Sequence, residues 1–292
     1  MAKKKFGDRK NARRVRGLSG LAQICIDLKP NRSVSDVYIN KKLDVTELCK
    51  YVDAKKKAGD KITYFHAFVT AIGKTIQNRP KLNYFVQNRH IFEHNDVVIS
   101  FVAKVDFSDA SEEVMIMVPV EKKDNIFTIR DKIAKKVDGF RNKKTKKEGA
   151  NSAIDTLGKL PNILRVPIVG IFKWCDKKGL LPDSLVQDNL YYSSVIVSNL
   201  GSIKCGAIFH NITDFGNSSS LITMGEIHEE EVIIDGKKQV RKLCEWGMNF
   251  DERIADGYYF AKSAQMLQYI LDNPKMLEED AGKKIEMPEI RK

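Results

Sequence analysis

A charged turn near the C-terminal end of the chain carries the residues whose types and spacing could do chemistry. Asp251, Glu252, Arg253 and Asp256 fall within six positions, directly before Gly257. The segments on both sides must reach the core, so we expect these charges to be partly buried. A buried charge needs a partner of opposite sign or hydrogen bonds. The sequence therefore predicts a paired cluster of ionisable groups at this turn.

The flanking segments predict how the turn is held. From Val240 to Phe250, apolar residues recur at nearly alternate positions, which predicts a strand with one buried face. From Tyr258 to Asn273 they recur every three to four positions, and Pro274 follows, which predicts an amphipathic helix. A strand and a helix therefore present the charged turn between them.

The turn resembles the Asp-His-Arg-x-x-Asp-Gly signature of the dihydrolipoyl acyltransferases, which form the core of 2-oxo acid dehydrogenase complexes. It also resembles the His-x-x-x-Asp-Gly signature of chloramphenicol acetyltransferase. Asp251, Arg253, Asp256 and Gly257 match these signatures, whereas Glu252 stands where the relatives have the catalytic histidine. The resemblance implies that Glu252 and Asp256 are active-site residues, and that Asp251, Arg253 and Gly257 support them.

A second motif follows a strand predicted from Tyr191 to Val197. Ser198-Asn199-Leu200-Gly201 resembles the Ser-Asn-Leu-Gly sequence of the same acyltransferases. In that family the serine donates a hydrogen bond to the oxyanion of the tetrahedral intermediate, so the resemblance implies this role for Ser198. Asn199 and Gly201 would support it. Without the resemblance, serine, asparagine and glycine here are equally typical of a turn.

Weaker matches keep the family's order from about residue 11 to residue 277. In Asp44-Val45-Thr46-Glu47-Leu48, Asp44 is a predicted helix cap and Glu47 the reciprocal capping residue. A helix predicted from Thr63 to Asn78 precedes Arg79-Pro80-Lys81-Leu82-Asn83. The resemblance implies an α/β (α+β) fold like that of chloramphenicol acetyltransferase, a mixed sheet flanked by helices. It further implies a homotrimer in which the signature turn of one subunit faces the serine of its neighbour.

Three regions organise the chain: a basic N-terminal arm at 1–18, an acyltransferase-like catalytic domain at 19–292, and within it an apolar helical insert at 149–188. One interpretation of the insert is one or two buried helices broken by Pro161 and Pro167. The other is a surface that packs on a partner subunit or on a membrane face, because so dense an apolar stretch needs cover.

Composition narrows the function classes. The chain has 292 residues, 42% hydrophobic and 30% charged, with no apolar run long enough to span a membrane and no signal-peptide pattern, so we expect a cytoplasmic protein. Five cysteines without a C-x-x-C pair predict reduced thiols and no zinc site.

The net charge of +12 could indicate nucleic-acid binding, but no nucleic-acid-binding motif accompanies it. Solvated basic tails are the preferred interpretation, and a basic surface would also attract the phosphates of coenzyme A. Much of the charge lies at Lys3, Lys4, Lys5, Arg9, Lys10, Arg13, Arg14 and Arg16, and at Lys143, Lys144, Lys146 and Lys147.

The histidines do not predict a metal site. His90 and His94 lie on a predicted strand, where they would be about 13 Å apart. His66 is interpreted as a packed core histidine. His210 could replace the missing base if its strand end reached the active-site channel; the alternative is an ordinary surface or core histidine.

Acyl transfer from a thioester to a thiol needs a base for the sulfur proton and a donor for the oxyanion. Histidine suits the first role, whereas a solvated glutamate with a pKa near 4.3 is a poorer base. Burial could raise the pKa of Glu252, and Arg253 or Lys262 could hold it down. Asp256 would pair with an arginine, such as Arg13, Arg14 or Arg16.

The sequence thus predicts an acyltransferase-family enzyme that transfers an acyl group from a coenzyme A thioester to a thiol or other acceptor. No lipoyl domain is recognised, so a lipoyl thioester would come in trans from another protein. Two alternatives remain: a catalytically inactive trimeric scaffold or coenzyme A-binding module, and a nucleic-acid-binding module acting through the basic arm. The acyl group, the acceptor and any assembly beyond a trimer are not specified.

Overall fold

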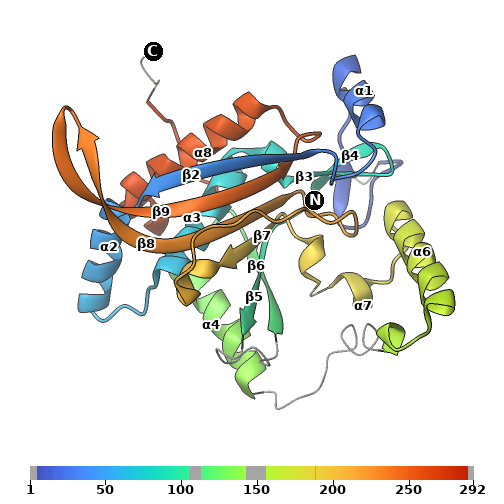
Figure 1. The fold of residues 1–292 in the computed structure, drawn as a ribbon, viewed down its shortest axis with the longest axis horizontal. Coiled ribbons are helices and arrows are strands. Elements are labelled where there is room, and N and C mark those ends of the chain that lie inside the picture. Colours follow the sequence, from blue (N-terminus) through green and yellow to red (C-terminus); the bar gives the residue numbers. More distant parts are fainter. Residues whose placement is uncertain (1–4, 105–112, 143–155, 188, 289–292) are drawn as a thin grey trace.

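A six-stranded mixed sheet forms the centre of the molecule, in the order β2-β9-β8-β7-β5-β6 (Figure 1). The computed structural model describes residues 5–104, 113–142, 156–187 and 189–288. β7 is parallel to both of its neighbours and the other pairings are antiparallel. The strands are β2 (Asp36–Asp44), β5 (Val97–Lys104), β6 (Glu113–Val120), β7 (Val195–Asn199), β8 (Ser220–Ile234) and β9 (Lys237–Asp251).

Four helices form a layer against this sheet: α2 (Thr46–Lys57), α3 (Tyr64–Asn78), α4 (Ile126–Asn142) and α8 (Gly257–Asp272) (Figure 1). Alternate strand residues point into the core between the layers, where Phe68 of α3 meets Trp246 of β9 edge to face at 5.1 Å. Phe250 likewise stacks on Phe260 of α8 at 4.6 Å. The predicted fold class is confirmed, and this core anchors both the end of β9 and the start of α8.

A smaller three-stranded sheet joins the N-terminal arm to the body of the protein. β1 (Ala12–Arg14) pairs with β4 (His90–His94), which pairs with β3 (Tyr84–Gln87). Residues 12–14 are therefore a strand, and the prediction of a solvated basic tail is wrong for them. Lys3, Lys4 and the 143–147 lysines lie outside the described residues.

The predicted strand, turn and helix around residue 251 are confirmed. A hairpin turn at Asp235-Gly236 joins β8 to β9. Both residues of that turn have a positive φ, 50° and 74°. Four 3-10 helices also lie within the described ranges: η1 (Pro80–Asn83), η2 (Leu190–Tyr192), η3 (Leu200–Ile203) and η4 (Pro274–Glu278).

The reciprocal capping box predicted at Asp44 and Glu47 does not form, although the Asp44 carboxylate accepts from the N–H of Thr46, the first residue of α2, at 2.9 Å. The cap of α2 is Val45, and the Glu47 carboxylate pairs with Lys50 at 2.8 Å because both side chains face solvent. A capping box exists instead at the start of α3, where the Thr63 hydroxyl accepts from the His66 N–H and the Thr63 N–H donates to His66 Nδ1. His66 is thus a half-buried capping residue, not a packed core histidine.

The apolar segment folds as α6 (Asn162–Lys178) followed by the short α7 (Asp183–Val186). Pro161 precedes α6, as predicted, but Pro167 lies inside the helix and does not break it. Water can satisfy the carbonyl of Ile163 that the proline ring leaves without a partner, since Ile163 is 81% exposed.

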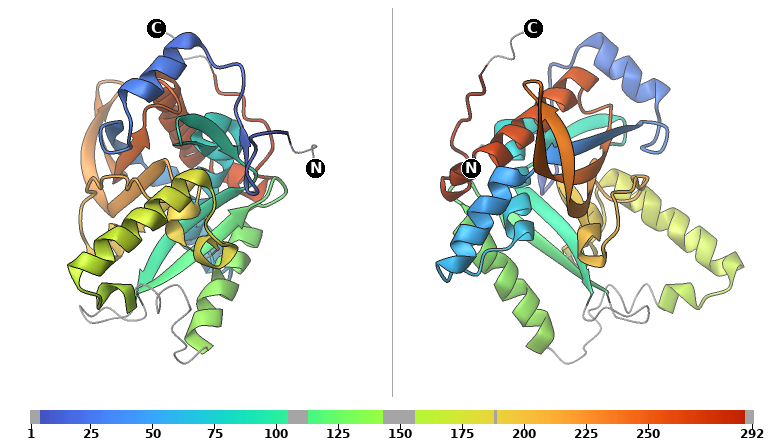
Figure 2. Two further views of the ribbon diagram at one scale, coloured as in Figure 1. Left: turned by 90° about the vertical axis from the view of Figure 1, so that its right-hand side faces the viewer. Right: turned by 60° about the vertical axis from the view of Figure 1, so that its left-hand side comes forward.

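The prediction of buried helices is wrong for α6, because its apolar side chains face outward. Figure 2 shows α6 as an outer helix. Asp176 holds it near its C-terminal end. The buried Asp176 carboxylate accepts from the Tyr192 hydroxyl at 2.7 Å and from the Gly216 N–H at 2.9 Å. No helix within the described ranges is long and apolar enough to cross a membrane.

Candidate active site

The turn after β9 is built on a buried ion pair. Arg253 donates from Nε and Nη2 to the two carboxylate oxygens of Asp251, at 2.8 and 2.7 Å. Asp251 is fully buried and Arg253 is 7% exposed, so the pair is held away from water. Two parallel bonds between an arginine fork and a carboxylate fix both groups. The prediction of a paired, partly buried charge cluster is confirmed here.

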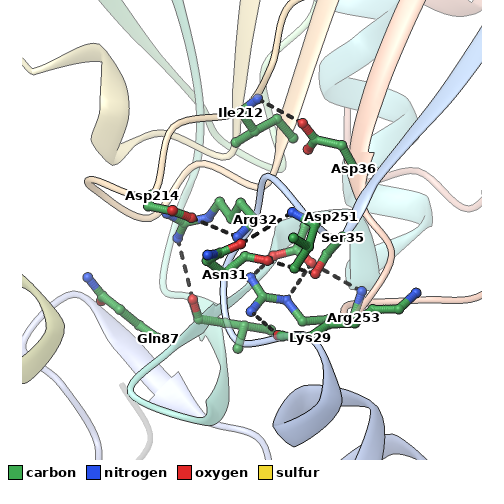
Figure 3. Close-up of polar contacts among 12 residues, drawn as sticks. Lys29, Asn31, Arg32, Ser35, Asp36, Gln87, Ile212, Asp214, Asp251 and Arg253 are labelled. Atoms are coloured by element: carbon green, nitrogen blue, oxygen red, sulfur yellow. Dashed lines mark hydrogen bonds and ion pairs between the residues drawn. The ribbon is translucent and has the colours of Figure 1, made fainter.

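A second buried arginine, Arg32, lies beside this pair (Figure 3). Arg32 Nη1 donates to the Thr213 carbonyl at 3.0 Å and Nη2 to the Gly216 carbonyl at 2.9 Å, while its backbone N–H donates to Asp214 at 2.7 Å. Burial lowers the pKa of Arg32, and the charge of Asp251 opposes that change. Nothing in the local sequence around Arg32 indicates this role, because its partners lie at least 54 residues away and three of them lie more than 180 residues away.

Asp36 extends the same cluster along β2, where it pairs in register with Asp251 (Figure 3). Its carboxylate accepts from the Ile212 N–H at 3.2 Å. Burial raises the pKa of Asp36, and the nearby Asp251 charge raises it further. The segment around residues 212–216 thus covers the end of the sheet at which the charged turn begins.

The Glu252 side chain lies outside this buried network and is partly exposed to solvent. Its backbone N–H donates to the Ser35 carbonyl at 2.9 Å. Its carboxylate forms an ion pair with Lys29, and the two side chains are 31% and 39% exposed. Lys29 follows α1 (Gly20–Leu28). The sequence had suggested Arg253 or Lys262 as the nearby cation, whereas Arg253 is committed to Asp251.

Asp256 caps helix α8 rather than pairing with an arginine. Its carboxylate accepts from the Tyr259 N–H at 2.8 Å, and the residue is exposed. Across the described residues, no ion pair joins Asp256 to an arginine. The predicted partners lie elsewhere: Arg16 pairs with Asp8 and Arg14 contacts His90. An aspartate at the first cap position satisfies a free helix N–H and complements the helix dipole, which explains this placement.

Gly257 begins α8, and a Cβ there would meet no atom within 4 Å. Packing within one chain therefore does not require a glycine at this position.

Ser198 lies near the end of β7, paired in register with Thr223 of β8. Its side chain is half-buried, and no hydrogen bond of its hydroxyl is recorded among the described residues. Asn199 is exposed and precedes η3 without a side-chain capping bond. Gly201 is tightly constrained, because a Cβ there would lie 2.6 Å from the Gly225 carbonyl oxygen. The motif thus makes a close turn beneath a free serine hydroxyl.

One chain does not bring Ser198 and Glu252 together. Ser198 pairs with Thr223, whereas the Asp251 N–H bonds to the Ser219 carbonyl at 3.0 Å, so the two residues lie at different heights along β8. With about 3.3 Å per strand residue and about 4.8 Å between strands, they are on the order of 20 Å apart. A site containing both residues needs groups from more than one chain.

The remaining histidines do not join the network at the turn. His210 is exposed, and its neighbours Phe209 and Asn211 contact Tyr38 of β2. Whether His210 replaces the missing base stays a prediction. His94 is buried on β4, and burial lowers its pKa to about 4.

Among the described residues, no group of three or more histidine, cysteine, aspartate or glutamate side chains could hold a metal ion. All five cysteines are free thiols.

Comparisons with known proteins found one matching family model and several solved structures of similar fold. The family model described as the catalytic domain of 2-oxoacid dehydrogenases acyltransferase matches residues 26–169 and 182–278. No curated protein sequence matches the chain.

Solved structures share the fold at low sequence identity. A probable dihydrolipoamide acetyltransferase from Listeria monocytogenes has a TM-score of 0.56 and 19% identity, covering 92% of this chain and 96% of that one. The dihydrolipoamide acetyltransferase of Azotobacter vinelandii, studied for the catalytic roles of a serine, a histidine and an asparagine, has a TM-score of 0.58 and 16% identity, covering 90% and 93%. A chloramphenicol acetyltransferase has a TM-score of 0.55 and 12% identity, covering 89% and 99%.

Proposed function

We propose, on the premise that the chain belongs to the family of 2-oxoacid dehydrogenase acyltransferase catalytic domains, that it transfers an acyl group from a coenzyme A thioester to a thiol or other acceptor. A lipoyl thioester supplied in trans by another protein is the alternative donor. One observation carries the proposal. Glu252, at the position of the family's catalytic histidine, leaves the buried Asp251–Arg253 pair with its backbone fixed and its carboxylate accessible.

Glu252 acts as the base in this reaction. As the acceptor sulfur attacks the thioester carbon, its proton moves to the Glu252 carboxylate. The carbonyl oxygen becomes an oxyanion, and the Ser198 hydroxyl donates a hydrogen bond to it. The intermediate then collapses, the carbon–sulfur bond to coenzyme A breaks, and the departing thiolate takes the proton from Glu252. Asp251 and Arg253 keep the turn in place and touch no reacting atom.

The Ser198 that completes the site belongs to a second copy of the chain in a homotrimer. The separation of about 20 Å within one chain supports this arrangement. Outward apolar side chains also need a covering surface, which further copies can supply. They include Ile163, Ile171 and Trp174 of α6, which are 81%, 63% and 56% exposed. We propose that the trimer acts in the cytoplasm.

A specific observation favours a second candidate, an inactive trimeric scaffold or coenzyme A-binding module. The base position holds a carboxylate paired with an ammonium instead of an imidazole. A carboxylate is the weaker base near neutral pH, so the fold could persist without turnover.

Turnover by the purified chain tests the proposal. With acetyl-CoA and dihydrolipoamide as substrates, we expect release of free coenzyme A, and a loss of about 10²-fold in kcat for Glu252→Gln. Glu230→Gln is the matched control, since Glu230 also pairs with a lysine and is similarly exposed, at 38%. Undiminished turnover in Glu252→Gln would exclude Glu252 as the base. Absence of turnover in the unmodified chain, with coenzyme A binding retained, would favour the scaffold.

A further inference from the structure

We propose that Lys29 is a positioning residue for Glu252, an inference that rests on the proposed function. Lys29 lies 224 residues before Arg253, outside every sequence motif of the site, yet its ammonium contacts Glu252 Oε1. It is the residue that follows α1, so its place in the fold is set by the end of that helix. The proposed base thus has a dedicated cation.

The backbone of Lys29 is fixed by the turn that carries Glu252. Arg253 Nη1 donates to the Lys29 carbonyl at 2.9 Å. The same guanidinium holds both oxygens of Asp251, whose backbone N–H bonds to the Ser219 carbonyl of the sheet at 3.0 Å. One arginine therefore ties the end of α1 to the end of β9.

The backbone of Glu252 is fixed from the other side by the segment that follows Lys29. The Glu252 N–H donates to the Ser35 carbonyl at 2.9 Å. Ser35 is buried, its N–H donates to the Arg32 carbonyl at 2.8 Å, and its hydroxyl donates to the Asn31 carbonyl at 2.8 Å. The 29–35 segment thus places both the lysine and the strand end that carries the carboxylate.

This construction differs from an ordinary surface ion pair, in which two long side chains meet by chance and water shares most of the attraction. Here the backbones of both partners are held by hydrogen bonds, so the fold sets the approach of the two charges. The ammonium directs one carboxylate oxygen and so restricts the orientation of the Glu252 carboxylate. The partial exposure of Glu252 leaves the carboxylate open to a substrate.

The separate effects on kcat and KM test this role. For Lys29→Met we expect kcat to fall about 3- to 10-fold with KM nearly unchanged, because the substrate still binds but the carboxylate is no longer held in one orientation. A merely structural lysine would instead lower stability and leave the kcat of the folded protein in place. Lys29→Arg keeps a cation at this position and should restore kcat. Lys42→Met removes the matched Lys42–Glu230 pair and should change neither kcat nor KM.

A spectrum that needs no activity gives a second readout. In protein labelled with ¹³C at glutamate carboxyls, the Glu252 signal is identified by its loss in Glu252→Gln. We expect this signal to shift at neutral pH in Lys29→Met and to keep its position in Lys42→Met. Either an unchanged kcat or an unchanged Glu252 signal in Lys29→Met, with Glu252→Gln inactive, would overturn this inference alone. Full turnover in Glu252→Gln would overturn the proposed function.

Discussion

The turn that carries Glu252 and the strand end that carries Ser198 differ in how many polar partners a single chain supplies to each of them. Around Glu252, Asp251, Arg253 and Arg32 are buried and bonded to segments from three parts of the sequence. Around Ser198, packing fixes the backbone through Gly201, but the hydroxyl has no hydrogen-bond partner within the described ranges. Both motifs match the family, yet only the first has its polar partners within one chain.

The roles proposed for the two residues would account for this difference. A base must be held in one place, which takes fixed polar contacts around it. An oxyanion donor must keep its hydrogen bond for a charge that develops only during the reaction, so a hydroxyl already bonded within the chain would serve less well.

Asp251→Asn should destabilise the protein by about 3–5 kcal/mol, because it leaves the buried guanidinium of Arg253 without its counter-charge. Urea unfolding followed by circular dichroism measures this. Ser198→Ala serves as the comparison and should shift the unfolding free energy by less than about 0.5 kcal/mol. Equal losses in the two variants would contradict the contrast between the two regions.

Ser198→Ala should reduce kcat by about 10²-fold, a loss of about 3 kcal/mol in transition-state stabilisation. Mixing two variants, each of which lacks one of the two residues, distinguishes a site shared between subunits from a site within one chain. Trimers reassembled from equal amounts of Ser198→Ala and Glu252→Gln chains should recover about one quarter of full activity, since that share of sites pairs an intact glutamate with an intact serine. Recovery of no activity would place both residues in one subunit's site.

Acid should weaken the region around Arg32, which borders His94. Burial lowers the pKa of His94 from 6.5 to about 4, so the unfolded chain binds the proton at higher pH than the folded chain. The stability that neutral His94 provides is complete above about pH 6.5 and is lost as the pH falls toward 4, by about 2 kcal/mol at pH 5. His94→Gln should flatten this slope in unfolding free energy, as urea unfolding at several pH values would measure.

Asp256→Ala should lower the unfolding free energy by about 1 kcal/mol through loss of the α8 cap. Asp256→Ser keeps a capping oxygen and should restore most of that stability, as thermal unfolding would measure. The same deficit in both variants would show that the carboxylate acts through its charge, and would revive the arginine pairing that the sequence suggested.

The sequence predicted the parts of the fold whose pattern is local. The alternation up to Phe250 and the helical period after Gly257 predicted the strand–turn–helix unit. Expectations failed where solvent or a nearby side chain changed the outcome. Pro167 is tolerated because α6 faces water, and His66 takes the capping role that Glu47 was expected to play at another helix.

The family, the strand and helix on which each motif lies, and the glutamate that stands where relatives keep histidine were all evident in the sequence. The groups that surround that glutamate depend on how the chain folds. Lys29 meets Arg253 across 224 residues and Arg32 meets Thr213 across 181, and both contacts use a backbone carbonyl that carries no side-chain signature. Hydrogen bonds to the main chain depend on where the chain passes and not on residue type, so no local pattern records them.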